Sequence, residues 1–135
     1  MPKYKSFDVI ALRGEGVSFE TNSLIGIQYF KIDGSSSTIR YDRSSSNTRI
    51  FQNGIGISMN LVDDADFYHL SIQMNYYKTK DTAKIYGSYQ HSQSNVTLAQ
   101  SQKYTLSANG YGNVIAFDDS VKRNYDGMSG VYLSV

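Results

Sequence analysis

Apolar and polar residues alternate along most of this chain. The clearest run spans residues 68–76, where every second residue is apolar. These apolar positions are Tyr68, Leu70, Ile72, Met74 and Tyr76. Successive side chains of a β-strand point to opposite faces, so the run predicts a strand with one apolar and one polar face. Residues 55–61 and 131–135 alternate in the same way and predict two further strands.

Segments rich in β-branched and aromatic residues predict the remaining strands. They cover residues 7–12, 17–21, 24–32, 38–42, 48–51, 83–89, 96–99, 104–108 and 114–117. Asp33-Gly34 and Asn53-Gly54 are hairpin signals between such segments. No segment has the length, capping residues and period of a convincing helix, although residues 63–66 and 119–123 could form single turns.

The regular spacing of these strands predicts the fold class. Short strands every 8–12 residues are typical of antiparallel sandwiches and barrels. With 40% hydrophobic and 19% charged residues, the chain has the composition of a globular protein. We therefore expect one all-β domain over residues 1–135, an antiparallel sandwich of about ten strands, most simply a jelly roll.

Charge, hydrophobicity and cysteine content limit the classes of partner and the cellular compartments that we expect. The net charge is only +1, whereas proteins dedicated to nucleic acids carry a strong basic excess, so we expect no nucleic-acid partner. No segment approaches the ~20 apolar residues needed to span a bilayer, so we expect no membrane insertion. The N-terminus lacks the apolar run of a secretory signal. Without cysteine there are no disulfides and no thiolate chemistry, and either redox compartment is tolerable.

Catalytic and metal-binding patterns are weak. The chain has two histidines: His69 falls on the polar side of the clearest strand, and His91 falls in a Ser/Gln-rich loop. A zinc site needs three or four ligands, and two histidines without cysteine are too few. The carboxylates of Asp63, Asp64 and Asp66 and of Asp118-Asp119 could hold calcium or serve a hydrolase, yet they do not follow the EF-hand spacing. Polar turns beside the strands explain these carboxylates more simply. We therefore expect no catalytic residues, no metal and no cofactor.

The abundant tyrosine favours contact surfaces as well as strands. The chain has 12 Tyr and no Trp, and tyrosine rings pack while their hydroxyl groups stay solvated. Arginine and tyrosine in one stretch could contact a phosphate, a sialic acid or an acidic partner. The residues expected to make outward contacts are Arg40, Tyr41, Arg43, Tyr111 and Tyr125.

Two segments resemble complement and tumour-necrosis-factor-like jelly-roll domains. Residues 66–73, Asp-Phe-Tyr-His-Leu-Ser-Ile-Gln, are similar to the Gly-x-Tyr-x-(Phe/Ile)-x-Tyr central strand of that family, without its glycine. Residues 128–133, Met-Ser-Gly-Val-Tyr-Leu, are similar to its closing Phe-Ser-Gly-Phe-Leu strand. Between them, residues 97–98 and 105–110 correspond to Leu-x-Leu-x-x-Gly-Asp, with Asn109-Gly110 in place of Gly-Asp.

This resemblance implies a domain that trimerises through aromatic strand faces, as in viral spikes and fibre heads. The expected packing and assembly residues are Tyr68, Leu70, Ile72, Met74, Val131 and Leu133. The first hypothesis is a non-enzymatic virion or surface module that contacts other virion proteins or a surface glycan, made without a signal peptide; a cytoplasmic location is the alternative. The second is a carbohydrate-binding module. The third is a small hydrolase that uses Asp63, Asp64 or Asp118.

Overall fold

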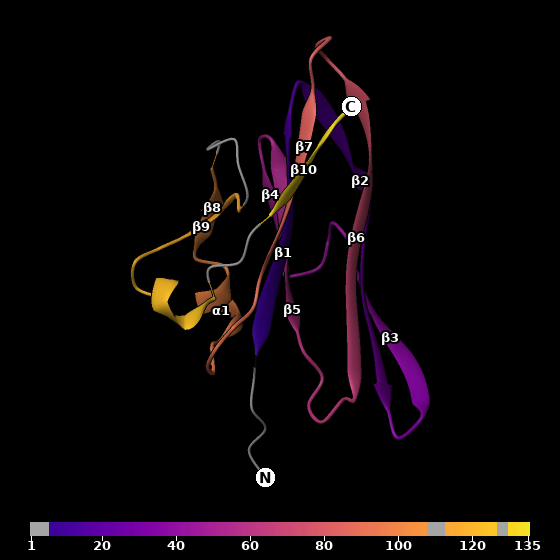
Figure 1. Cartoon of the computed structure of the whole chain (residues 1–135), viewed down its shortest axis with the longest axis vertical. Helices are drawn as coiled ribbons and strands as arrows, with labels where there is room; N and C mark the ends of the chain where they lie inside the picture. Colours follow the sequence, from indigo (N-terminus) through magenta and orange to yellow (C-terminus); the bar gives the residue numbers. More distant parts are fainter. Residues whose placement is uncertain (1–5, 108–112, 127–129) are drawn as a thin grey trace.

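The computed structural model describes residues 6–107, 113–126 and 130–135 and is built mainly of β-strands (Figure 1). The strands in these residues are β1 (Phe7–Glu15), β2 (Val17–Ile32), β3 (Ser35–Tyr41), β4 (Thr48–Phe51), β5 (Gly54–Asn60), β6 (Phe67–Lys78), β7 (Lys84–Gln90), β8 (Tyr104–Leu106), β9 (Ile115–Phe117) and β10 (Val131–Ser134). The helical elements are α1 (Leu98–Ser101) and the 3₁₀ turn η1 (Lys122–Asn124).

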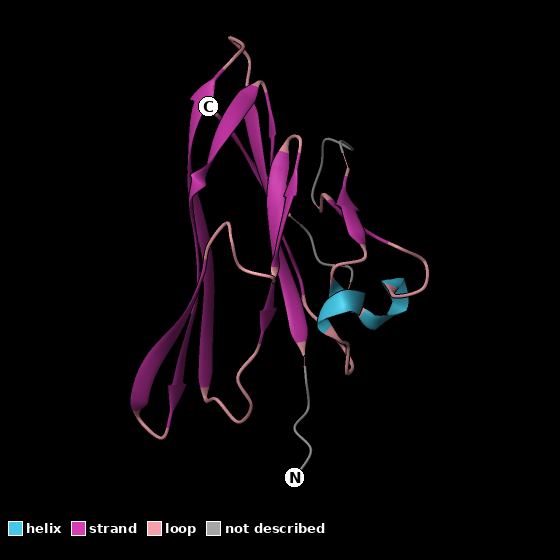
Figure 2. Ribbon diagram, turned by 180° about the vertical axis from the view of Figure 1, so that it is seen from behind, coloured by secondary structure: helices cyan, strands magenta, loops and turns pink. Residues whose placement is uncertain are grey.

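Three layers pack on one another. The central layer is a five-stranded antiparallel sheet with the order β10-β7-β1-β5-β4. The antiparallel sheet β3-β2-β6 packs on part of one of its faces, and α1 and the antiparallel pair β8-β9 lie on the other (Figures 1 and 2). Strands β1 and β5 are buried on both faces, so their side chains contribute to two separate cores.

The first core lies between the two larger sheets. Ile55, Ile57 and Met59 of β5 are fully buried there against Leu24 of β2. The second core lies under the small layer, where Val9 and Ala11 of β1 pack with Val96, Tyr104, Ile115 and Tyr125. Gly56 sits on this second face of β5, and a side chain at that position would collide with the hydroxyl group of Tyr104.

The hairpin between β2 and β3 follows its sequence signal. Asp33 and Gly34 both have positive φ angles, 50° and 82°, which is the backbone conformation of a type I′ turn. This turn fixes the register in which Ile32 pairs with Ser35. Residues 17–21 and 24–32, expected as two strands, form the single strand β2, which is interrupted by an irregularity between Glu20 and Ile25.

The antiparallel sandwich of about ten strands is confirmed. Jelly-roll connectivity stays a prediction, since the pairings form sheets of five, three and two strands. The strand expected at residues 96–99 is wrong. Thr97 caps α1 instead: its hydroxyl accepts a hydrogen bond from the Gln100 amide (3.1 Å), and the Gln100 side chain accepts one from the Thr97 amide (2.9 Å).

Candidate binding groove

The two larger sheets differ in strand number, and this leaves one side of the sandwich open. Strand β6 lies at the edge of the three-stranded sheet and is in contact with β1 of the five-stranded sheet. Strands β7 and β10 continue the five-stranded sheet beyond β1, away from β5. In the described residues, the smaller sheet ends at β6, whose main contact with the five-stranded sheet is with β1.

Two adjoining cavities follow this open side. The first has a volume of about 390 Å³ and is lined by Tyr68 and Leu70 of β6 together with Tyr89 and His91. The second has a volume of about 280 Å³ and includes Ile72, Gly87 and Val131 among its lining residues. Ile10 and Tyr89 line both cavities, so they form one feature, called here the open-side groove.

Large apolar side chains remain exposed beside the groove. Val131 is 73% exposed and Leu133 is 65% exposed on the edge strand β10. Tyr68, which lines the first cavity, is 37% exposed. Large apolar side chains on strands are usually covered, and in the described residues no strand covers these.

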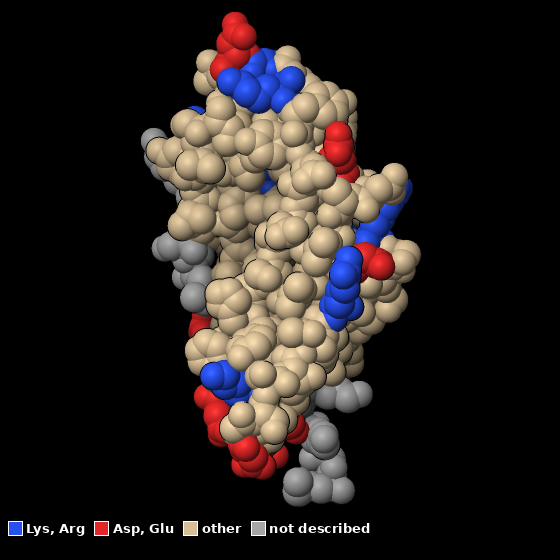
Figure 3. Space-filling view, turned by 90° about the vertical axis from the view of Figure 1, so that its right-hand side faces the viewer, with Lys and Arg blue, Asp and Glu red and all other residues tan. Residues whose placement is uncertain are grey.

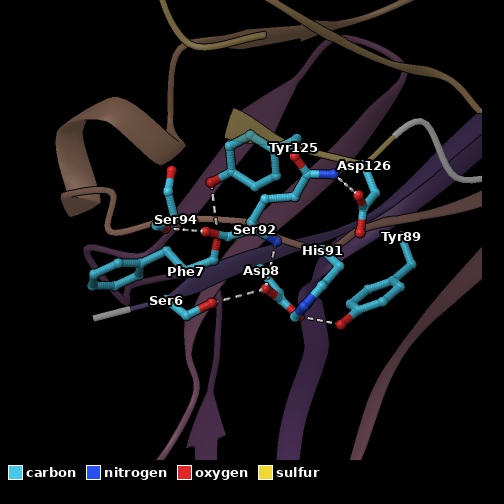
Figure 4. A network of polar contacts seen from close by, with 10 residues as sticks. Ser6, Phe7, Asp8, Tyr89, His91, Ser92, Ser94, Tyr125 and Asp126 are labelled. Atoms are coloured by element: carbon cyan, nitrogen blue, oxygen red, sulfur yellow. Dashed lines mark hydrogen bonds and ion pairs between the residues drawn. The ribbon is translucent and has the colours of Figure 1, made fainter. Parts of the chain in front are cut away.

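A network of polar contacts closes one end of the groove (Figure 4). Its centre is Asp8 of β1, which is fully buried. The Asp8 carboxylate accepts hydrogen bonds from the hydroxyl of Tyr89 and from the backbone amide of Ser92 (2.9 Å), and Nδ1 of His91 lies 2.9 Å from Oδ2. Ser6 adds a longer contact of 3.4 Å from its hydroxyl.

This network orients the two rings that face the groove. Nδ1 of His91 lies at hydrogen-bonding distance from the buried Asp8 carboxylate, which holds the imidazole ring in place at the end of the groove. The side chain of His91 is 46% exposed, which leaves part of the ring accessible to a ligand. Burial, and after it the hydrogen bond to Asp8, raises the pKa of Tyr89, so its hydroxyl stays protonated at neutral pH. The arrangement can hydrogen-bond a polar group at the end of an otherwise apolar groove.

The residues predicted for outward contacts do not form one site. Arg40 and Arg43 are exposed, and Nη1 of Arg43 donates to Oδ1 of Asn22 (2.6 Å). The prediction is wrong for Tyr41 and Tyr125, which are each only 7% exposed. Tyr111 lies outside the described residues.

Packing explains the two wrong predictions. Tyr41 belongs to the core between the larger sheets, where it packs with Leu24 and Ile55. Tyr125 stacks on Phe117 with ring centroids 4.0 Å apart, and its hydroxyl donates to the carbonyl of Phe7 (2.7 Å). Tyrosine tolerates such burial when its hydroxyl finds a partner.

The residues predicted for packing and assembly gather around the open-side groove. Leu70, Ile72 and Met74 are half-buried against the core between the larger sheets. Three others remain exposed beside the groove, Tyr68, Val131 and Leu133. Sequence reasoning missed Asp8, although an acidic residue within the apolar run Phe-Asp-Val-Ile-Ala-Leu was a detectable signal of a buried polar site.

The acidic clusters have roles in turns. Oδ2 of Asp66 accepts a hydrogen bond from the Asp33 amide (3.2 Å), and Oδ1 of Asp118 accepts one from the Ser120 amide (3.2 Å). In residues 6–107, 113–126 and 130–135, no group of three or more His, Asp or Glu side chains is placed to hold a metal ion.

Comparison with known proteins gives no relative: no family model, no curated protein and no solved structure matches this chain. No helix in the described part of the chain is long and apolar enough to cross a membrane.

Proposed function

We propose that this protein is a non-enzymatic assembly module that associates with further protein chains through its open side. The observation that carries the proposal is the exposure of Val131 and Leu133 on β10, beside an apolar groove; β10 pairs with β7, and no described strand pairs with its outer edge. A virion or particle surface is the setting that we propose, on the strength of the jelly-roll resemblance and the tyrosine-rich, cysteine-free composition.

The energetics favour association. Burying a valine or leucine side chain contributes about 1.5–3 kcal/mol, so covering these two residues alone supplies a substantial part of a contact energy. Strand edges are normally protected by charged residues. Residues 67–77 of β6 and the whole of β10 contain no Asp, Glu, Lys or Arg. Both edges are therefore suited to contact with another chain.

The native mass in solution tests this proposal. Light scattering after size exclusion, over a wide dilution range, should give an oligomer, and the jelly-roll resemblance favours a trimer. A double variant, Val131→Ser with Leu133→Ser, should dissociate. Ile50→Ser is the matched control, because Ile50 is 44% exposed on the opposite edge strand β4. A monomer at every concentration would contradict self-assembly.

A second candidate function is carbohydrate binding, favoured by the first cavity of the groove. Tyr68 and Tyr89 provide aromatic rings there, and His69 and His91 provide polar groups. Sugars bind where ring faces and hydrogen-bonding groups combine in a concave site. A glycan array with wild type and His91→Ala tests it, and the absence of a signal on every sugar class would remove this candidate.

A further inference from the structure

The three-stranded sheet ends at a long free edge. Strand β6 pairs with β2 along one edge, and in the described residues nothing pairs with the other. In an antiparallel ladder, backbone groups of alternate residues bond to opposite sides, so roughly half of the backbone N–H and C=O groups of β6 point to this free edge. They form a template for one more strand.

We propose that an extended segment of another polypeptide chain adds to the free edge of β6 as a fourth strand and fills the open-side groove. This inference rests on the proposed assembly function and specifies the partner. Such strand addition gains affinity from main-chain hydrogen bonds and specificity from alternate side chains. Here every second side chain of the added strand would point toward the five-stranded sheet and cover Val131 and Leu133, which are exposed without it.

The geometry favours a single strand over a second folded copy. Neighbouring strands lie roughly 4.8 Å apart and packed sheets roughly 10 Å apart, so a strand beside β6 would lie above β7 and β10. Ile72 of β6 and Val131 of β10 already line the same cavity. A folded copy that paired through its own β6 would bring a second five-stranded sheet into the space that β7 and β10 occupy.

The charges at the two ends of β6 specify the ends of the partner strand. Asp63, Asp64 and Asp66 lie before the first residues of β6, and Lys78 and Lys80 lie at its end. Figure 3, which views the molecule from the side of the three-stranded sheet, shows acidic side chains gathered at the lower end beside a basic one, and basic side chains at the upper end beside acidic ones. The middle of this view has few charges except along its right-hand edge. The partner strand therefore has a basic end beside Asp66, an acidic end beside Lys78, and apolar residues at alternate positions between.

The chain itself contains a segment with this pattern, which provides a defined probe. Residues 64–80 begin with acidic residues, end with basic residues and alternate between. Placed antiparallel to β6 and centred on Ile72, the segment would give the cross-strand pairs Asp64 with Lys80, Asp66 with Lys78, Phe67 with Tyr77, Tyr68 with Tyr76 and Leu70 with Met74. Opposite charges and aromatic pairs in these positions stabilise antiparallel pairing.

The experiment uses the full chain and a synthetic peptide of residues 64–80. Saturable binding is measured by fluorescence anisotropy, and the bound strand is located by hydrogen exchange of backbone amides. We expect the peptide to slow the exchange of β6 amides while exchange at the opposite edge strand β3 stays unchanged. A peptide with Ile72→Pro should not bind, because proline removes a backbone donor and blocks strand pairing.

Protein variants locate the binding surface independently of folding. Val131→Asp changes an exposed side chain on the floor of the groove and should weaken peptide binding by about tenfold or more, whereas Ile50→Asp on strand β4 should leave it unchanged. A peptide with all four terminal charges exchanged (Asp64→Lys, Asp66→Lys, Lys78→Asp and Lys80→Asp) should bind more weakly in antiparallel register.

Three results would overturn the inference: no saturable binding, protection at β3 in place of β6, or equal binding by the Ile72→Pro peptide. If the protein forms oligomers that Val131→Ser with Leu133→Ser dissociates, yet the peptide fails these tests, the assembly function stands and strand addition is wrong. If β6 amides are protected in a peptide-free dimer of the folded protein, the occupant is a second copy, and the single-strand partner is likewise wrong.

Discussion

Replacing Asp8 by alanine tests the polar network at the end of the groove. Asp8 is fully buried and accepts the Ser92 amide at 2.9 Å, while Ser92 is itself only 1% exposed. Without the carboxylate, this amide is left buried and unsatisfied, which costs about 1–3 kcal/mol. The contacts with Tyr89 and His91 are lost as well, and hydrogen bonds to a charged group are worth about 1.5–3 kcal/mol each. Because such contributions overlap, we expect the free energy of unfolding to fall by about 3–5 kcal/mol.

Urea denaturation of the two proteins at pH 7 measures this difference directly. Asp8→Asn should cost less than Asp8→Ala, because its amide oxygen still accepts the Ser92 hydrogen bond. Asp119→Ala is the matched control, since Asp119 is exposed, and its effect should stay within about 0.5 kcal/mol. A loss below about 1 kcal/mol for Asp8→Ala would refute the view that this carboxylate organises the end of the groove.

Three further changes test the packing around the groove and the second core. Gly54→Ala should destabilise the protein by about 1–3 kcal/mol, because the new Cβ would collide with the carbonyl oxygen of Leu12. Urea denaturation measures this, and an unchanged midpoint would contradict the close approach of β5 to β1. Nη1 of Arg49 donates to the carbonyls of Gln102 (2.7 Å) and Tyr104 (2.5 Å) and so joins β4 to the small layer. Arg49→Leu should therefore lower the free energy of unfolding by about 2–3 kcal/mol, and no change would show that this link is dispensable. Burial raises the pKa of Tyr104 above its ordinary value of 10.0. The unfolded chain therefore loses the tyrosine proton at lower pH than the folded protein does, and the free energy of unfolding falls by about 1.4 kcal/mol for each pH unit above 10. Tyr104→Phe should therefore flatten the loss of stability measured between pH 9 and pH 11.5, and because the Tyr104 hydroxyl has no hydrogen-bond partner, it should not destabilise at pH 7.

Local alternation predicted the strands well because a strand depends on its own side-chain pattern. Strand β4 has the predicted bounds, and β6 extends the predicted residues 68–76 by only a few residues. The error at residues 96–99 has a local cause. Val96, Thr97 and Leu98 have side chains typical of strands, but Thr97 and Gln100 have the spacing of a capping box, and that signal determines the conformation.

The groove could not be predicted from alternation, because alternation identifies an apolar face and not what covers it. Whether an apolar face is covered depends on how many strands the opposite sheet has, and that number is set by pairing between strands far apart in the sequence. Thus Leu70 and Ile72 are half-buried, as an apolar face predicts, while Val131 and Leu133 have the same pattern and remain exposed. The same reasoning applies to Tyr125, whose burial depends on its contact with Phe117 in the separate β8-β9 hairpin.

The contrast between the two sides of the sandwich argues that the open side is a contact surface. The other edge strand of the three-stranded sheet is β3, which carries three serines and Arg40, and that of the five-stranded sheet is β4, which carries Arg49. Polar and charged side chains on edge strands discourage pairing with other chains. On the open side, residues 67–77 of β6 and all of β10 lack charged residues. If the open side were exposed to solvent in the assembled protein, we would expect charged residues on the edge strands beside its exposed apolar side chains. Charged side chains lie on the edge strands β3 and β4, whereas residues 67–77 of β6 and all of β10 have none, and this distribution favours an open side that is occupied in the assembled protein.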